Sequence, residues 1–473
     1  MSGNRAPALA AIIALLSAGV TVGDDRPPTS PNTLLLALDG VGHHHLVQAR
    51  ARGAFAGWPE PRPLVSTFPS MTNIGFVAIL SPLEPSPMPG YEVRHFDHRE
   101  NRIVGGSPIG LKKQLGAWRG LFDASTTSLW GKAFIHLWPK AGARRELDRI
   151  EKLVLEHPQE RMLGLVSSSD TLAHVDGDEA TIRLLLDVSA RVDRLRSEHA
   201  ARHGRPLRVI VLSDHGNGGG KVRAAGGIRR VLEEAGLRPT DRLLGPTDIV
   251  VVSYGVCGYG SLFLARERAE TAAAAVLGHE GVELAAWISA EGELRVRGRD
   301  GEALVRWRGA APFRRMTYEP RIGDPLRLAG PRSELERAGR LDDDGFAYES
   351  DWFEVSGAGD YPDALTRLVD GLAGRFVNNA ATVLFSYAPG YALGIRTARA
   401  GAWLLGGKLE ATHGGLDRES TWGIYLRSDD DGRAGVPIRA DAALAEWADA
   451  PELRAALEAQ LHASRLHRPR ILR

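Results

Sequence analysis

Cysteine is almost absent from this chain: among 473 residues there is one, Cys257. A single cysteine excludes an intrachain disulfide and any zinc site that is built on several thiolates. Cys257 stands in the apolar sequence Tyr-Gly-Val-Cys, which predicts a small buried side chain rather than a reactive thiol. Any metal site must therefore use oxygen and nitrogen ligands.

The sequence also lacks an excess of charge of either sign. Lys and Arg total 59 and Asp and Glu total 58, so the formal net charge is +1. This balance gives no indication of a nucleic-acid partner or of an anionic membrane surface. With 43% hydrophobic and 25% charged residues, the composition is that of an ordinary globular protein. A chain of 473 residues usually holds more than one domain, or one large domain that carries an insertion.

Beyond the N-terminus, no segment is apolar for long enough to cross a bilayer. The N-terminal segment itself has Arg5, then no charged residue over 6–23, with an apolar centre at 12–16 and small residues at 17–19. This layout is typical of a secretory signal peptide and predicts export to the periplasm or the extracellular space. Whether residues 1–23 are cleaved stays open, and an uncleaved leader or anchor is the alternative.

Three apolar runs predict buried strands, at residues 33–38, 163–166 and 209–212. Between the second and third runs, residues 180–201 repeat apolar side chains at helical spacing. A strand, a crossover helix and a strand form the βαβ unit of a parallel sheet. We therefore expect an α/β protein with a doubly wound, mostly parallel sheet that is flanked by helices.

The pattern changes after Asp248. Short alternating runs at 282–287, 294–296 and 304–307 are separated by turns that contain glycine, and they predict a small antiparallel unit. The expected core consists of two segments, residues 31–248 and 360–426. An α+β cap is inserted at 249–359, and a helical, basic C-terminal tail follows at 427–473.

Charged and polar side chains follow the three predicted strands where each strand ends. Asp39 follows the first run, Asp170 follows the second, and Asp214 and His215 follow the third. In an open α/β sheet, ligands bind outside the carboxyl ends of the strands, so these side chains are expected to converge. His174 lies four residues after Asp170, a spacing that brings both side chains to one side of a helical turn.

Carboxylate oxygen and imidazole nitrogen, without thiolate, suit zinc or another divalent transition metal in an open catalytic site. Thr72 precedes an apolar helical stretch at 74–80, where free backbone N–H groups and the helix dipole favour a phosphate. Thr72 is therefore the candidate nucleophile. The alternative is structural: Ser70 or Thr72 caps this helix.

A late histidine, His413, stands in the sequence Thr-His-Gly. With it, the ordered set resembles the alkaline phosphatase superfamily, and most closely its type I phosphodiesterase/nucleotide pyrophosphatase branch. The motifs that carry the resemblance are Leu38-Asp39-Gly40, Phe68-Pro69-Ser70-Met71-Thr72, Asp170 with His174, Ser213-Asp214-His215-Gly216 and Thr412-His413-Gly414.

The resemblance implies two zinc ions and a threonine nucleophile that is transiently phosphorylated. One ion would be held by Asp39, Thr72, Asp214 and His215, and the other by Asp170, His174 and His413. It also implies a doubly wound fold of the alkaline phosphatase type.

The expected function is hydrolysis of phosphoric esters, with phosphodiesters or nucleotide pyrophosphates as small-molecule substrates. Asn73, beside Thr72, and Arg418, soon after His413, are the candidate substrate-binding residues, although Arg418 is as well explained by a surface ion pair. Three alternatives stay open: a phosphomonoesterase or a phosphonate hydrolase with the same site, or a metal-binding protein without turnover.

Overall fold

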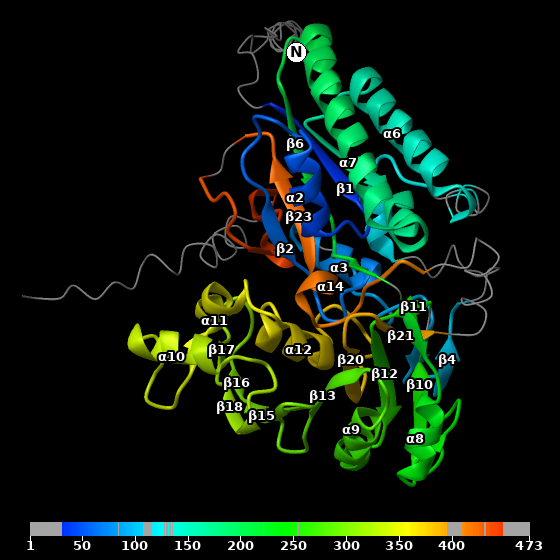
Figure 1. Ribbon diagram of the computed structural model, residues 1–473, viewed down its shortest axis with the longest axis vertical. Coiled ribbons are helices and arrows are strands. Elements are labelled where there is room, and N and C mark those ends of the chain that lie inside the picture. The colour runs from blue at the N-terminus through cyan, green and yellow to red at the C-terminus, as the bar shows by residue number, and fades with distance from the viewer. Residues whose placement is uncertain are drawn as a thin grey trace, which may run out of the picture.

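The structure is a computed structural model, and it describes residues 31–447 except 84, 107–115, 127, 129–130, 132–133, 135, 221, 253–254, 395–408 and 430–431. The chain forms two parts, each built on one large sheet, with α3 (Thr72–Ile79) and α14 (Arg418–Thr421) between them (Figure 1). No helix in the described ranges is both long enough and apolar enough to span a membrane. The predicted signal peptide lies outside the described residues.

The first sheet has six strands in the order β24-β2-β23-β6-β1-β5. Its strands are β1 (Asn32–Leu38), β2 (Arg62–Val65), β5 (Arg161–Val166), β6 (Leu207–Leu212), β23 (Trp422–Arg427) and β24 (Ile438–Arg439). β1 lies at the centre of the parallel part, paired with β5 and β6, while β23 runs antiparallel to both β6 and β2. The three predicted strands and the α/β class are confirmed, with an antiparallel strand inside the sheet.

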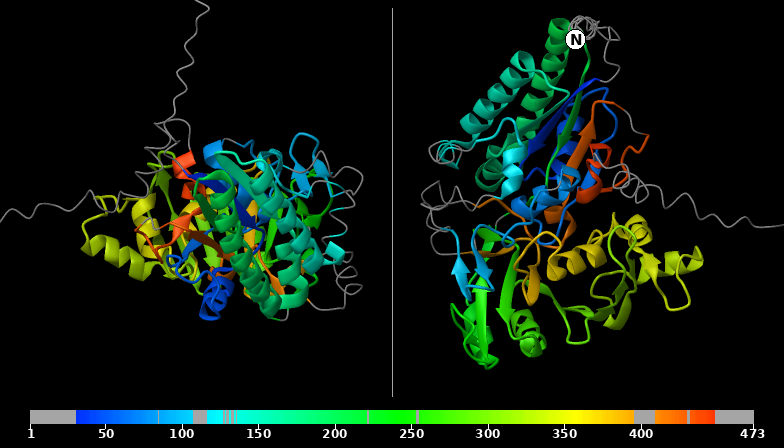
Figure 2. Two further views of the ribbon diagram at one scale, coloured as in Figure 1. Left: turned by 90° about the horizontal axis from the view of Figure 1, so that it is seen from above. Right: turned by 180° about the vertical axis from the view of Figure 1, so that it is seen from behind.

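Alternate residues of β1 face two different cores, which explains why the strand is apolar from Leu34 to Leu38. Leu34, Leu36 and Leu38 pack under the helices on one face, and Leu35 and Ala37 belong to the core on the other. The first face is covered by α2 (His43–Ala51), α6 (Pro139–Glu156) and α7 (Ser168–His203). Figures 1 and 2 show α6 and α7 side by side. The second face is covered by α3.

The predicted helix at 180–201 is part of the longer helix α7, which begins at Ser168. Gly177, with φ of 70° and ψ of −167°, breaks the helical geometry inside it. Asp170 and His174 therefore lie on the short helical segment before this break, directly after β5. The four-residue spacing thus places them on one side of a helical turn.

The second sheet has eight strands in the order β18-β15-β14-β13-β20-β12-β10-β9, and β9 with β10 is its parallel pair. The strands are β9 (Arg238–Pro239), β10 (Asp248–Val252), β12 (Tyr259–Leu264), β13 (Val282–Ile288), β14 (Leu294–Gly298), β15 (Gly301–Val305), β18 (Glu319–Gly323) and β20 (Val383–Tyr387). Its helices are α8 (Ile228–Glu234), α9 (Ala269–Leu277), α10 (Ala329–Arg337), α11 (Glu349–Ser356) and α12 (Ala364–Ala373).

This sheet extends beyond both predicted boundaries of the cap, 249 and 359. β9 precedes the first boundary, and β20, which follows the second, lies at the centre of the sheet between β12 and β13. Every residue of β20 is buried, with Leu384 in one apolar core and Val383, Phe385 and Tyr387 in another. Its partners are therefore set by burial on both faces rather than by its place in the chain. The expected cap is therefore a larger second part that also takes in residues placed by sequence in the core.

Smaller elements complete the chain: β3 (His95–Asp97), β4 (Arg102–Val104), β7 (Gly218–Gly219), β8 (Arg223–Ala225), β11 (Val256–Cys257), β16 (Trp307–Arg308), β17 (Arg315–Met316), β19 (Ala347–Tyr348), β21 (Tyr391–Gly394), β22 (Ala411–Thr412) and the 3₁₀ turns η1 (Ser81–Leu83), η3 (Ala117–Leu121), η4 (Arg266–Arg268), η5 (Ala440–Ala442) and η6 (Ala445–Trp447). The predicted helical tail at 427–473 begins instead with β24 and two 3₁₀ turns, and residues 448–473 lie outside the described ranges.

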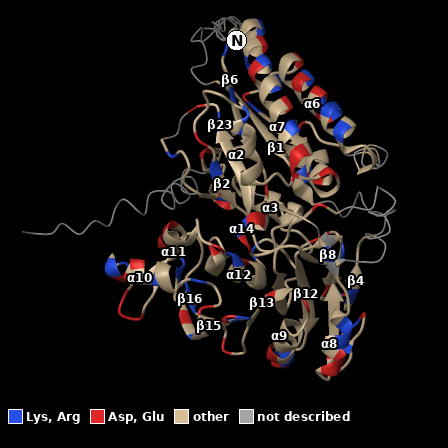
Figure 3. Ribbon diagram, viewed as in Figure 1, with Lys and Arg blue, Asp and Glu red and all other residues tan. Residues whose placement is uncertain are grey.

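One apolar core joins the two parts. It includes Leu35 of the first sheet, Phe76 of α3, Leu368 of α12 and Leu284 of the second sheet. Charged residues of both signs are interspersed over the helices of both parts (Figure 3). The carboxyl ends of β1, β5 and β6 lead to the residues between the two parts, where the predicted site lies.

Candidate metal centre

Four of the predicted ligands form one group at the ends of β1 and β6 and the start of α3. Thr72 Oγ1 donates to Asp39 Oδ1 at 3.0 Å and lies 3.2 Å from His215 Nε2. His215 Nε2 lies 3.3 Å from Asp214 Oδ2 and 3.9 Å from Asp39 Oδ1. These atoms are close enough together to share one ion.

The other three predicted ligands form a second group beside the first. Asp170 Oδ1 lies 3.4 Å from His174 Nε2 and 3.8 Å from His413 Nε2. The rings of His215 and His413 stack with their centroids 4.0 Å apart, and this stack joins the two groups. Ligand atoms of Asp170, His215 and His413, and separately of Asp39, Asp214 and His215, lie within 4.8 Å of one another.

All three imidazoles are oriented by a backbone carbonyl. Nδ1 of His174 lies 2.7 Å from the Ala411 carbonyl oxygen, that of His215 lies 2.8 Å from Gly216, and that of His413 lies 2.9 Å from Ser70. Nδ1–H donates in each of these contacts, since a carbonyl can only accept. This leaves the Nε2 lone pair directed at the carboxylates, which is how metal-binding histidines are usually held.

The carboxylates carry more negative charge than their surroundings balance. Burial raises the pKa of Asp39 well above its usual value, and the charges of Asp214 and Asp170 raise it further. Burial likewise raises the pKa of Asp214, and its Oδ2 is buried without a hydrogen-bond partner among the described residues. An orphaned carboxylate oxygen among other acids fits a divalent cation, which would supply the missing positive charge.

The histidines are suited to act as neutral ligands. Burial and, to a smaller extent, the nearby His215 lower the pKa of His413 to about 3. Burial also lowers the pKa of His215. His174 differs: burial opposes its protonation, but the Asp170 charge outweighs burial and raises its pKa to about 9. A metal ion bound to His174 would take the place of that proton.

Backbone geometry at Gly40 brings the two groups together. Its N–H donates to Asp214 Oδ1 at 3.2 Å, and its φ is +65°. A Cβ at this position would lie 2.3 Å from Asp170 Oδ1, so a side chain would collide with a predicted ligand. Asn217 Nδ2 adds a hydrogen bond to Asp170 Oδ1 at 3.3 Å. Gly40 is thus required by both its conformation and the close approach of Asp170.

Thr72 is the first residue of α3, and its hydroxyl does not cap the helix. The N-cap residue is Met71, which makes no side-chain capping bond. Ser70 Oγ lies within hydrogen-bonding distance of the carbonyls of Thr67 and Gly415 instead, both at 3.1 Å. The structural alternative for Thr72 and Ser70 is therefore wrong, and the Thr72 hydroxyl faces Asp39 near the free N–H groups of the first helical turn.

The two predicted substrate-binding residues have other partners here. Asn73 Nδ2 donates to the buried Glu92 Oε2 at 3.2 Å. The Arg418 guanidinium donates to the Gly359 carbonyl and to Asp360 Oδ1, both at 3.0 Å, so the ion-pair alternative describes it. For Asn73 a role in substrate binding stays a prediction, and Arg418 would have to leave Asp360 to contact a phosphate.

A basic residue that the sequence did not single out lies near the site. Arg119 packs over Trp118 at 4.7 Å, and Trp118 stacks on Phe76, one helical turn after Thr72. The positive charge of Arg119 lowers the pKa values of Asp39 and Glu92 and so partly offsets the increase that burial causes. Among the described residues its side chain has no hydrogen-bond acceptor, and its Nε is buried. Arg119 follows no motif, so no pattern in the sequence could have identified it.

Glu92 is the second residue near the site that sequence reasoning missed. It is buried, and burial raises the pKa of its carboxyl to about 7. Through its hydrogen bond with Asn73 it contacts the first turn of α3, next to Thr72. Glu92 lies far in sequence from every predicted site residue except Thr72 and Asn73, so no residue spacing indicates it.

No protein-family model matches the chain, and no curated protein sequence matches it. Among solved structures, it is similar to a phosphonoacetate hydrolase from Sinorhizobium meliloti 1021 in complex with phosphonoformate, with 14% identity, coverage of 91% of this chain and 96% of that one, and a TM-score of 0.49. It is also similar to murine ectonucleotide pyrophosphatase/phosphodiesterase 5, with 10% identity, coverage of 87% and 92%, and a TM-score of 0.43. At these values, similarity alone does not assign an activity to this chain.

Proposed function

We propose that the protein is a metal-dependent hydrolase of phosphoric esters and a member of the alkaline phosphatase superfamily, with Thr72 as its nucleophile. One observation carries the proposal: the Thr72 hydroxyl, at a helix N-terminus, lies 3.0 Å from Asp39 Oδ1 and 3.2 Å from His215 Nε2. A hydroxyl with no capping role, placed among buried metal-type ligands, suits phosphoryl transfer.

The donor set fits two divalent ions, and oxygen with imidazole nitrogen favours zinc. Asp39, Thr72, Asp214 and His215 would hold one ion. Asp170, His174 and His413 would hold the other. When bound, the two ions would lower the pKa of the Thr72 hydroxyl and neutralise charge on the phosphoryl oxygens.

The protein's own residues position the reactants. Asp39 accepts the Thr72 hydrogen bond and so fixes the direction of the hydroxyl lone pairs. The N–H groups at the start of α3 offer donors for a phosphoryl oxygen. Attack by Thr72 Oγ1 forms a Thr–O–P bond while the bond from phosphorus to the leaving alcohol oxygen breaks. The hydroxyl proton ends on the released alcohol. Water then cleaves the Thr–O–P bond, which releases the phosphate monoester formed from a diester substrate and restores the Thr72 hydroxyl.

The expected substrates are phosphodiesters or nucleotide pyrophosphates, as small molecules. Export through the N-terminal segment, to the periplasm or out of the cell, belongs to the same proposal. N-terminal sequencing of protein recovered from outside the cytoplasm would test it, because a mature start near residue 24 is expected. Protein that is found only inside the cytoplasm would contradict export.

The central test compares Thr72→Ala with Thr72→Ser. Hydrolysis of bis-p-nitrophenyl phosphate should fall by roughly a thousandfold or more in Thr72→Ala, because the nucleophile is lost. Thr72→Ser keeps a hydroxyl and should keep part of the activity. Metal content, measured by elemental analysis, should be about two ions per chain in the wild type.

Two results would contradict the proposed enzyme. Full activity of Thr72→Ala would show that Thr72 is not the nucleophile. Bound metal without turnover of any phosphate or phosphonate ester would favour the metal-binding protein without activity.

A second candidate function, hydrolysis of phosphomonoesters or phosphonates with the same site, is favoured by Arg119. A monoester or a phosphonate presents one more anionic oxygen than a diester does. The Arg119 guanidinium has free donors, lies within electrostatic range of Asp39 and Asp214, and has no acceptor among the described residues. A planar guanidinium matches two oxygens of a phosphate group.

The two candidates are separated by the ratio of kcat/KM on mono- and bis-p-nitrophenyl phosphate. If the second holds, Arg119→Gln should lower monoester kcat/KM by about 10- to 100-fold, the loss of one charge-assisted contact, and change diester kcat/KM far less. Arg99→Gln is the matched control, since Arg99 is exposed. Equal losses on both esters would contradict the role of Arg119 in substrate choice.

A further inference from the structure

Arg367, on α12, is a buried arginine that binds carbonyl groups and a hydroxyl instead of a carboxylate. Its Nη1 donates to the carbonyls of Pro362 and Leu416, both at 3.0 Å. Its Nη2 donates to the Thr67 carbonyl at 3.0 Å and to Ser70 Oγ at 2.9 Å. The residue is 3% exposed, and burial lowers its pKa to about 9.

Apart from Pro362, which precedes α12, the acceptors belong to the two loops that carry functional residues. Thr67 and Ser70 precede Thr72, and Leu416 follows His413. The loops also touch each other directly: the Ser70 N–H donates to the Gly414 carbonyl at 3.4 Å. The Ser70 carbonyl in turn accepts the hydrogen bond from His413 Nδ1 at 2.9 Å. Arg367 therefore contacts the residue that orients a predicted metal ligand.

Helix α12 is held close to the first of these loops. A Cβ at Gly371, one turn after Arg367, would lie 2.4 Å from the Phe68 carbonyl oxygen. The glycine thus permits backbone contact between the helix and the loop. Because α12 and the second sheet share one core, the loop that leads to Thr72 is fixed against the second part of the molecule.

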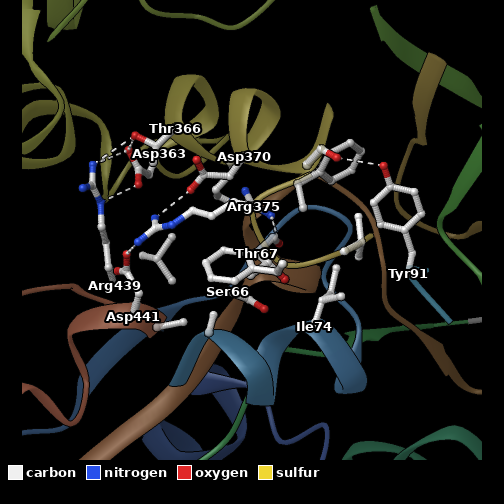
Figure 4. Close-up of a pocket in the computed structure, with 18 residues that line it drawn as sticks. Ser66, Thr67, Ile74, Tyr91, Asp363, Thr366, Asp370, Arg375, Arg439 and Asp441 are labelled. Atoms are coloured by element: carbon white, nitrogen blue, oxygen red, sulfur yellow. Dashed lines mark hydrogen bonds and ion pairs between the residues drawn. The ribbon is translucent and has the colours of Figure 1, made fainter. Parts of the chain in front are cut away.

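Neighbouring arginines are bound differently, as Figure 4 shows. Arg375 pairs with Asp370, and Arg439 pairs with Asp363, each through a carboxylate. They line a cavity of about 30 Å³ next to Thr67, large enough for a water molecule. Arg367 lines the same cavity but sends its donors to the loops. Its fork of donors holds several acceptors at fixed angles, which a lysine cannot reproduce.

We propose that Arg367 is a positioning residue that fixes the Ser70 carbonyl, and through it His413, in the geometry that metal binding requires. The proposal rests on the proposed function for the role of His413 as a ligand. Arg367 touches no reacting atom. Its effect is on the affinity for the ion at Asp170, His174 and His413.

The first experiment titrates zinc into metal-free Arg367→Met, Arg367→Lys and wild-type protein and follows binding by calorimetry. In both variants one of the two zinc sites, assigned here to Asp170, His174 and His413, should lose about 10- to 100-fold in affinity, the usual effect of removing an outer partner of a metal ligand. The other site should change little. The matched control is Arg314→Met, since Arg314 is also buried but binds Glu349 and Asp370 and touches neither loop.

Ser70→Ala keeps the proposal testable if the arginine variants do not fold. It removes the Oγ that Arg367 contacts but leaves the Ser70 carbonyl, so a smaller loss at the same zinc site is expected. Wild-type affinity at both sites in Ser70→Ala and in a folded Arg367→Met would overturn the positioning role, as would an equal loss in Arg314→Met. A wild-type protein that binds no divalent ion would instead contradict the proposed function itself.

Discussion

Two clusters of buried charged residues differ in how their charges are balanced. In the metal-ligand cluster (Asp39, Asp170, Asp214, His174, His215, His413 and Thr72), no arginine or lysine within the described ranges forms an ion pair with a carboxylate. In the arginine–carboxylate cluster (Arg314, Arg375, Arg439, Glu349, Asp363, Asp370 and Asp441), the signs alternate. Arg314 bridges Glu349 at 2.8 Å and Asp370 at 2.7 Å, and Arg375 bridges Asp370 and Asp441, both at 2.9 Å.

The pKa shifts of Asp39, Asp214 and Asp370 follow this difference. Asp170 and Asp363 depart from it: burial is outweighed by His174, which lowers the pKa of Asp170, while burial outweighs Arg439 and raises the pKa of Asp363 to about 6. Burial and like charges raise the pKa of Asp39, and burial raises that of Asp214. Burial also acts on Asp370, but Arg375 and Arg314 outweigh it and hold its pKa below the usual value. A cluster that balances its own charge can serve as structure alone, whereas a buried cluster of acids needs cations from outside. The difference therefore separates a ligand site from a structural one.

Removal of metal is the change with the largest expected effect on this comparison. After dialysis against a chelator, turnover of phosphate esters should fall by roughly a thousandfold or more, because several kcal/mol of charge stabilisation are lost. Added zinc should restore it. The melting temperature should rise on adding zinc, since an ion that binds the folded state stabilises it. Unchanged activity and melting temperature in the chelated protein would show that the charges of the metal-ligand cluster are balanced without ions.

Breaking the arginine–carboxylate cluster should lower stability and leave zinc binding unchanged. Arg439→Met leaves Asp363 and Glu349 buried with one partner fewer, so the free energy of unfolding should fall by about 3–5 kcal/mol. Arg327→Met is the control: its ion pair with Asp360 is about half exposed and should contribute at most about 1 kcal/mol. Urea unfolding and zinc titration check both. A large loss of zinc affinity in Arg439→Met would remove the distinction between the clusters.

The smallest expected effect is on the pH dependence of the metal-free protein. Because the folded-state pKa values of Asp39 and Asp214 are raised, the folded state binds more protons than the unfolded state above the ordinary carboxyl pKa. Their contribution to stability is therefore lost as pH rises towards the folded-state values, by up to about 1.4 kcal/mol per pH unit for each group.

Urea unfolding of chelated protein between pH 5 and 7, an interval of about two units above the ordinary carboxyl pKa, measures this slope. His215 and His413, whose pKa values are lowered, contribute with the opposite sign below the ordinary histidine pKa, so the change between variants is the informative quantity. Asp214→Asn should make the slope less negative, because one of the two raised carboxyl groups no longer titrates. Asp343→Asn is the control, as Asp343 is exposed. An identical slope in Asp214→Asn and the wild type would contradict the raised pKa of Asp214.

Local patterns in the sequence were enough for the elements nearest the site. The apolar run at 33–38 corresponds to β1, and the helical spacing at 180–201 lies within α7. Both patterns are local consequences of burial: every residue of a strand buried on both faces is apolar, whereas a helix buried on one face has apolar residues once per turn. The position of β20 could not be obtained in this way, because its neighbours β12 and β13 lie about a hundred residues earlier in the chain. The same holds for the boundaries of the second part.

By itself, the sequence determined which side chains follow strand ends and which residue types are available to a metal, because strand periodicity and ligand chemistry are properties of short segments. The tertiary structure decided which of these side chains meet, that Arg418 pairs with Asp360, and that Arg119 and Arg367 lie beside the site. Those outcomes depend on packing between segments far apart in the chain, and no short pattern specifies which distant donor will lie beside which acceptor once both are buried.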